Sequence, residues 1–127
     1  MKRVNMWPLC YGKAVSKYVL VSPRKARLMA DVIRNQKVEV AMDQLRFAEN
    51  KAGRLLYKTL ASALANAETL HQVQRREMRV CEVRVDGGPM MKRGKSQSRG
   101  RRVPIMKRTS HLSVSVGKVD PRKMKEE

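Results

Sequence analysis

Residues 78–118, MRVCEVRVDGGPMMKRGKSQSRGRRVPIMKRTSHLSVSVGK, decide the fold of this chain. Within the run from Met78 to Asp86, Cys81, Val83 and Val85 alternate with Glu82 and Arg84, which is the period of a strand buried on one face. Apolar residues and serines alternate in the same way from Leu112 to Val116. The two runs are therefore predicted to pair antiparallel, with residues 87–111 forming the connection between them.

The connection is rich in positive charge and lacks negative charge. No acidic residue occurs from Gly87 to Val119, whereas nine basic residues do: Lys92, Arg93, Lys95, Arg99, Arg101, Arg102, Lys107, Arg108 and Lys118. A hairpin that closes near Gln97 and Ser98 would have arms of about 13 residues reaching about 40 Å. A compact chain of this length has a radius of gyration of only about 14 Å, so the hairpin is predicted to protrude.

The predicted hairpin is too weak to hold its own shape. An isolated two-stranded ribbon is marginal in water, and this one is weakened further by Gly94, Gly100, Pro89 and Pro104. We expect it to become fully ordered only when an anionic partner surrounds it. A disordered basic loop is the alternative, but the matched flanking strands favour a hairpin.

Upstream of this segment, the sequence predicts one strand and one helix. Valines and a leucine between Ala14 and Val21 indicate an edge strand. Ser22-Pro23 predicts the start of a helix that runs to about Arg34, since serine can cap the first amides and proline suits the first helical position. The predicted apolar stripe of this helix consists of Ala26, Met29, Ala30 and Ile33, widened by Leu28 and Val32.

Two further helices follow. One is predicted from Val38 to about Ala48, and a longer one from Lys51 to about His71 with Asn50 as its cap. Alternate alanines in the longer helix let another backbone approach closely, so it is predicted to pack on the sheet or on the first helix. The fold class is α+β: three helices packed on a small antiparallel sheet, with a long protruding β-hairpin.

The 127 residues suffice for a single domain. Its globular body is predicted to comprise residues 14–86 and 106–118. The extended basic β-hairpin takes residues 87–105, and a flexible leader, 1–12, and tail, 120–127, complete the chain.

The net charge of +18 indicates a polyanionic partner, because self-repulsion of this size weakens a compact state. Nucleic acid fits best. A membrane fits poorly, since the basic residues are not confined to one face of an amphipathic helix. Aromatic residues are scarce, so contacts to phosphate and to shape are expected rather than base stacking on rings. Arg24, Lys25 and Arg27 crowd a helix N-terminus, which also indicates an external anion.

The residues give no support to catalysis or to a metal, cofactor or small-molecule site. Cys10 and Cys81 are distant in sequence, so neither has a predicted thiol neighbour, and Cys81 is expected to be a small core residue. His71 and His111 lack a carboxylate or thiol at useful spacing. Gly87-Gly88-Pro89 is a turn signal rather than a phosphate loop. No signal peptide, transit peptide or membrane span is expected.

Four segments carry a resemblance to a known family. SPRKARLMADVIRNQKV (22–38), SALANAE (62–68), VRVDGGPMMKR (83–93) and PIMKRTSHLSVSV (104–116) resemble the large-subunit ribosomal protein 22 family in its bacterial form. The resemblance implies a structural, non-enzymatic protein whose α+β domain sits near the opening of the peptide exit tunnel. The hairpin would run inward through the large-subunit rRNA, with its tip lining the tunnel.

The resemblance also implies partners and site residues. The expected partners are several rRNA domains, neighbouring ribosomal proteins including one that faces the tip at a constriction, and the nascent peptide, with early binding during subunit assembly. Expected rRNA contacts are Lys17, Arg24, Lys25, Arg27, Lys92, Arg93, Lys95, Arg99, Arg101, Arg102, Lys107, Arg108, Thr109, Ser110 and His111. The tunnel-lining tip would be Gly94, Lys95, Ser96, Gln97, Ser98, Arg99, Gly100 and Arg101.

Three questions stay open at this point. Many bacterial members have a hydrophobic-Met-Pro-Arg-Ala-Lys-Gly-Arg-Ala pattern where residues 94–102 here are GKSQSRGRR, so the tunnel contacts differ in detail. The expected location is a cytoplasmic ribosome, with an organellar ribosome as the other choice. The competing function is a free nucleic-acid-binding factor, such as a DNA-bending dimer with basic β-arms.

Overall fold

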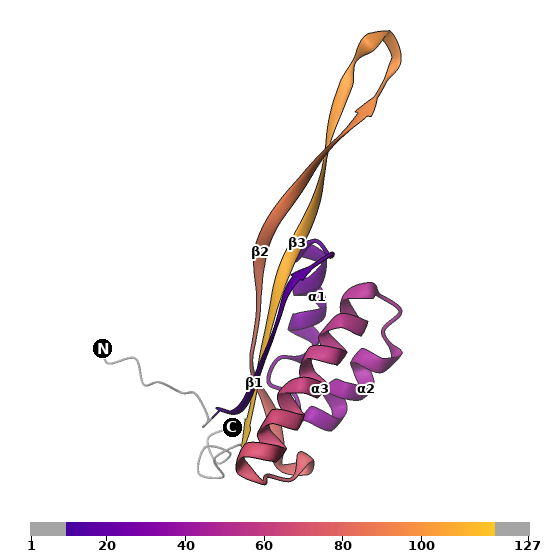
Figure 1. Ribbon diagram of the computed structural model, residues 1–127. Coiled ribbons are helices and arrows are strands. Elements are labelled where there is room, and N and C mark those ends of the chain that lie inside the picture. The colour runs from indigo at the N-terminus through magenta and orange to yellow at the C-terminus, as the bar shows by residue number, and fades with distance from the viewer. Residues whose placement is uncertain (1–9, 119–127) are drawn as a thin grey trace, which may run out of the picture.

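The computed structural model describes residues 10–118, and these form an α+β fold (Figure 1). The elements in chain order are β1 (Cys10–Val19), α1 (Pro23–Ile33), α2 (Val38–Phe47), α3 (Lys51–His71), β2 (Met78–Ser96) and β3 (Arg102–Lys118). The three predicted helices and the fold class are confirmed. No helix among these residues is long and apolar enough to cross a membrane.

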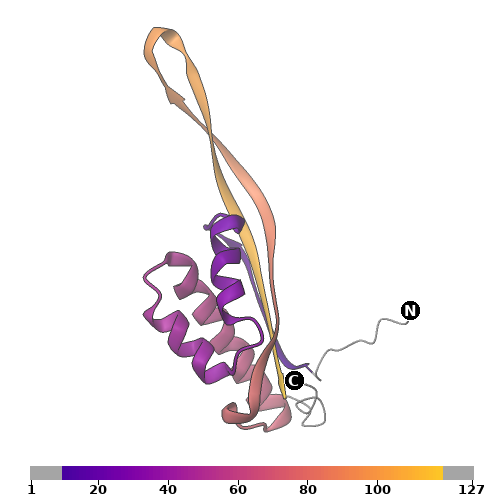
Figure 2. The same cartoon turned by 180° about the vertical axis from the view of Figure 1, so that it is seen from behind.

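The sheet is antiparallel with the strand order β1-β3-β2, so β1 is an edge strand as predicted. Val83 lies opposite Val114 and Val85 lies opposite Leu112, which confirms the predicted pairing of the two alternating runs. All three helices cover one face of the sheet, as the two opposite views show (Figures 1 and 2). The apolar side chains of the strands and helices meet between these layers and form a single core.

Strand β1 begins at Cys10, four residues before the predicted start at Ala14. Residues 10–12, predicted as part of the leader, therefore belong to the sheet, and residues 1–9 and 119–127 lie outside the described part. Gly12 accounts for this earlier start of β1, because its backbone packs directly on α3. A Cβ on Gly12 would overlap the carbonyl oxygen of Ala63 and lie 2.7 Å from the Cβ of Ala67. The predicted close approach to the alanines of α3 is confirmed.

Two details of the helices differ from the prediction. Leu28 and Val32 are exposed, because Ala26, Ala30 and Ile33 form the buried stripe of α1 and residue 28 points away from it. Ser22 and Asn50 occupy the N-cap positions of α1 and α3, but neither side chain makes a capping hydrogen bond. Both helices are therefore stabilised by packing more than by their caps.

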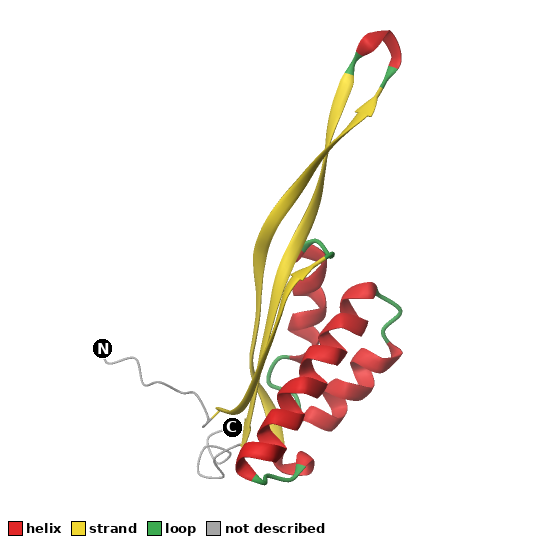
Figure 3. Ribbon diagram, viewed as in Figure 1, coloured by secondary structure: helices red, strands yellow, loops and turns green. Residues whose placement is uncertain are grey.

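Strands β2 and β3 continue past the helices as a two-stranded ribbon, which Figure 3 shows in yellow. Beyond an irregularity between Gly87 and Met90, the strands pair without interruption from Met90 opposite Arg108 to Ser96 opposite Arg102. The chain reverses through one turn of 3-10 helix, Ser98–Gly100, slightly later than predicted. Arg99 and Gly100 take φ values of +58° and +71° there, and these values set the centre of the turn.

Deleting residues 94–102 is expected to leave the body folded. None of these residues belongs to the core, and the deletion leaves Val103 and Pro104 as a short link between the paired Arg93 and Ile105. Thermal melting followed by circular dichroism should show one cooperative transition within a few degrees of the parent protein. A broad, non-cooperative melt would refute the independence of body and hairpin.

Candidate nucleic-acid interface

The hairpin distributes its cations evenly over both faces of the ribbon. Directly opposed residues of antiparallel strands share a face, so one face carries the pairs Met90–Arg108, Lys92–Met106, Gly94–Pro104 and Ser96–Arg102. The other face carries Met91–Lys107, Arg93–Ile105 and Lys95–Val103. Every pair except Gly94–Pro104 contains one cation, and none contains an acid. Neither face is therefore suited to packing against the protein's own body.

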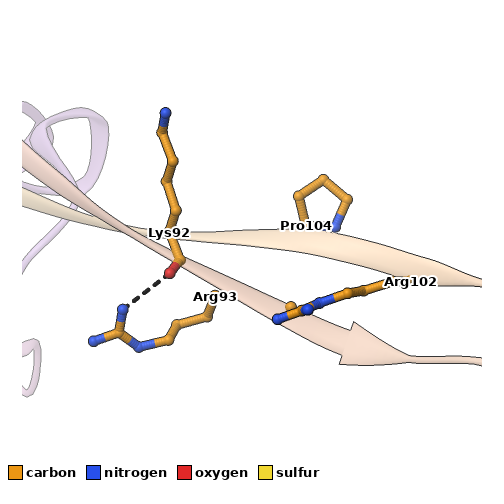
Figure 4. A pocket seen from close by; sticks show the side chains of 5 residues that line it. Lys92, Arg93, Arg102 and Pro104 are labelled. Atoms are coloured by element: carbon orange, nitrogen blue, oxygen red, sulfur yellow. Dashed lines mark hydrogen bonds between the residues drawn. The ribbon is translucent and has the colours of Figure 1, made fainter.

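The pair Gly94–Pro104 has no cation of its own, but the guanidinium of Arg102, from the next pair on the same face, lies beside it. A Cβ on Gly94 would overlap the guanidinium of Arg102, so only glycine leaves that group its place beside the strand. Lys92, Arg93, Gly94, Arg102 and Pro104 line an open recess of about 280 Å³ at this point. Figure 4 shows Lys92 and Pro104 on one side of the ribbon and Arg93 on the other, where it donates a 2.9 Å hydrogen bond to the Lys92 carbonyl.

The hairpin cations are not neutralised by the protein itself. Within residues 10–118, no Lys or Arg between positions 92 and 108 lies within salt-bridge distance of a carboxylate. The ion pairs lie in the body, for example Arg84 with Glu82 at 2.6 Å and Lys118 with Glu77 at 2.7 Å. The hydrogen bond that the Lys118 ammonium donates to the Glu77 carboxylate raises the pKa of this ammonium. Lys118 is therefore the one member of the nine-residue basic set that is held by the body.

The predicted body cations lie near the point where the ribbon leaves the helices. Lys17 is exposed on β1, and Arg24 and Lys25 are exposed in the first turn of α1, which contains no acidic residue. Arg27 is also exposed, but its Nε and Nη2 both lie 3.4 Å from the carbonyl oxygen of Val85. Arg27 thus ties α1 to β2 and has fewer donors left for an external anion.

Thr109 and Ser110, both predicted as RNA contacts, are buried instead. Their exposed fractions are 5% and 0%, and the Thr109 hydroxyl donates a 2.6 Å hydrogen bond to the Pro89 carbonyl. Gly88 permits this contact, because a Cβ there would overlap the Thr109 hydroxyl. Ser110 shares the core face of β3 with Leu112, since side chains two residues apart point the same way. We therefore leave the side chains of Thr109 and Ser110 out of the proposed RNA interface.

Among residues 10–118, the buried hydroxyl of Ser110 has no hydrogen-bond partner. Ser110→Ala is therefore expected to stabilise the protein by about 1 kcal/mol, because an unsatisfied buried hydroxyl is costly. Denaturant unfolding should show a higher midpoint with an unchanged slope. Thr109→Val, which removes a hydroxyl that is hydrogen-bonded, is the matched control and should lower the midpoint. A destabilised Ser110→Ala variant would contradict this assignment.

His111 lies at the base of the ribbon and is half-buried. Its Nδ1 accepts a 3.0 Å hydrogen bond from the Tyr18 backbone N–H, so a proton on the neutral ring belongs on Nε2. The Tyr18 and His111 rings meet edge to face with centroids 4.9 Å apart. Sequence analysis missed Tyr18, because nothing in the local pattern of either strand signals a contact across 93 residues.

The two cysteines are neighbours, which corrects the prediction that neither has a second thiol nearby. Cys10 lies opposite Gly117 on β3, and Gly117 lies opposite Arg79 on β2, so no β3 side chain separates β1 from β2 there. Cys81 is buried as predicted, and burial raises the pKa of its thiol to about 12, with a further contribution from the charge and hydrogen bond of Cys10. Cys81 is therefore a protonated, unreactive thiol at neutral pH.

Comparisons with known proteins identify the family of this chain. The family model described as ribosomal protein L22p/L17e matches residues 14–117. Large ribosomal subunit protein uL22 of Chlamydia trachomatis serovar L2 is 57% identical over 105 residues, covering 83% of this chain and 95% of that protein. The protein of the same name from Protochlamydia amoebophila is 56% identical over 108 residues, covering 85% of this chain and 97% of that protein.

These relatives are bacterial ribosomal proteins, which confirms the predicted ribosomal location in the cytoplasm. They align with almost their whole length, so the likeness includes the helices, the sheet and the hairpin together. The chain belongs to the ribosomal protein L22p/L17e family and is a structural protein of the large ribosomal subunit, not an enzyme.

Proposed function

We propose that this protein binds large-subunit rRNA chiefly through its hairpin and supports the assembly of the subunit. The observation that carries the proposal is the arrangement of six cations, three on each face of a ribbon that has no acidic residue. A cationic ribbon of this kind is stabilised when phosphates surround it on both faces, since each contact also releases counterions from the RNA. The apolar partner in five of the six pairs that carry a cation, such as Met106 or Ile105, fills space between the charges.

The proposed interface extends from the ribbon onto the body. It includes Lys92, Arg93, Lys95, Arg99, Arg101, Arg102, Lys107 and Arg108 on the hairpin, with Lys17, Arg24, Lys25, Arg27 and His111 at its base. These residues span the length of the ribbon as well as the first turn of α1 (Figure 1). An interface of this length would touch several rRNA domains, which supports a role in holding them together during assembly.

We further propose that residues 94–101 line the nascent-peptide exit tunnel. The support is family membership together with the position of these residues at the end of the ribbon furthest from the helices (Figures 1 and 2). The nascent peptide and a ribosomal protein on the opposite side of the tunnel would then be neighbours of the tip. Residues 94–102 depart from the common bacterial pattern, so these contacts are expected to differ in detail from those of many bacterial members.

Sedimentation separates this proposal from its competitor. The tagged full-length chain, expressed in a bacterial host, should cosediment with large subunits through a sucrose gradient at moderate salt and should be monomeric when purified. A DNA-bending factor with β-arms would instead be a stable dimer that changes the mobility of duplex DNA. A dimer that is absent from the large-subunit fractions would refute the ribosomal function.

A further inference from the structure

Two aromatic rings from distant parts of the chain meet at the base of the hairpin. Tyr18 lies near the end of β1 and His111 lies on β3, and their ring planes are at 88° with centroids 4.9 Å apart. The backbone hydrogen bond from Tyr18 to His111 Nδ1 fixes the position of the two residues. Strand β1 ends where β2 and β3 extend past the helices (Figure 1), so the contact near its end adjoins the proposed RNA interface.

The Tyr18 ring is held in solvent by an unfavourable backbone conformation. Its φ is +57°, in the left-handed region that residues with a Cβ avoid, and 64% of the residue is exposed. The shift in strand register between Ser16 and Val19 produces this geometry. Tyr18 is not a member of the hydrophobic core. The strained backbone therefore gains no burial in the core, and its return is limited to the contacts with His111. Strain of this kind concentrates at functional positions.

The groups around the two rings suit a nucleobase better than a phosphate. His111 has its Nε2 available as a donor, because Nδ1 is already an acceptor. Asp86 lies directly opposite His111 on the same face of the sheet, and its exposed carboxylate repels phosphate but can accept hydrogen bonds from a base edge. Lys17 beside Tyr18 is exposed and close enough in sequence to meet the backbone phosphate of the same nucleotide.

We propose that Tyr18 and His111 form a stacking site for one unpaired base of an RNA strand. The inference rests on the proposed RNA-binding function and adds a contact that does not depend on charge. Stacking on an aromatic ring tolerates any base, because every base has a π-face. The site gives the body a fixed point on the RNA at the place where the hairpin enters it.

The test compares an adenine hexaribonucleotide with an abasic ribose-phosphate strand of the same length, each titrated into the full-length chain. The parent protein is expected to bind the hexanucleotide about 10-fold more tightly than the abasic strand. Tyr18→Gly should abolish this preference without changing the dependence of affinity on salt, because it removes a ring and no charge. Glycine suits the positive φ, so this variant should keep its fold. Tyr18→Phe keeps the ring and should keep the preference.

The outcomes separate the stacking site from the proposed function. A parent protein that binds neither strand at low salt would refute RNA binding altogether. Equal binding of both strands by the parent protein, or a Tyr18→Gly variant that retains the preference, would overturn the stacking site alone. Tyr18→Asn, which also tolerates the left-handed backbone, provides a second ring-free variant with the same expected loss if Tyr18→Gly melts at a lower temperature.

Discussion

Gly12→Ala is expected to destabilise the protein by about 3 kcal/mol, the largest effect we expect from any single substitution in the body. The added Cβ would overlap the Ala63 carbonyl oxygen and lie 2.8 Å from the Ala67 nitrogen, so it would meet helix backbone rather than a movable side chain. Ala63 and Ala67 are fully buried, and Asn66 donates a 3.0 Å hydrogen bond to the Lys13 carbonyl beside this contact. Strand β1 could accept the methyl group only by separating from α3.

The chain offers a matched control for this prediction. Gly87 also lies in a strand and does not have a positive φ, and no atom of the described residues would lie within 4 Å of a Cβ at this position. Gly87→Ala should therefore change the free energy of unfolding by less than about 0.5 kcal/mol. Urea unfolding of the two variants measures the difference directly. Equal midpoints for Gly12→Ala and the parent protein would show that the contact between β1 and α3 is loose.

The parts of the fold that sequence predicted well are those with a local period. The repeat of apolar residues in α3 and the alternation in β2 and β3 each fix which face is buried, so their type and pairing followed directly. Residues 10–13, CYGK, show no such period. Their place in the sheet depends on Gly12 meeting α3, which is a contact between distant segments and has no local signal.

The candidate site likewise has features that the sequence pattern predicts and contacts between distant segments that it does not. The absence of acidic residues from the hairpin is visible in the sequence, and so is the alternation that spreads its cations over both faces. Burial of Ser110 could also have been predicted, because counting back by twos from Leu112 places it on the core face. The approach of Tyr18 to His111, and of Cys10 to Cys81, depends on how β1 and β2 are each placed against β3. No pattern within a single strand contains that information.

Replacing Lys92, Arg93, Arg101 and Arg102 together with alanine is expected to weaken binding to large-subunit rRNA by about 10³-fold at 0.1 M salt. Each cation that meets a phosphate contributes about one unit to the slope of log affinity against log salt. The slope should therefore fall by about four. The variant should melt like the parent protein, since all four side chains are exposed and none belongs to the core.

A second quadruple variant separates a local interface from the effect of net charge. Four exposed cations of α2 and α3 serve for this purpose: Arg46, Lys51, Arg54 and Lys58. Changing them to alanine lowers the net charge by the same amount at a surface outside the proposed interface. Filter binding over a range of salt concentrations should then give a slope close to that of the parent protein. Only direct contacts between the ribbon cations and phosphates make the position of a lost charge matter. If both variants lowered the slope equally, the affinity would depend on the total charge of the protein, and the ribbon would not be the RNA interface.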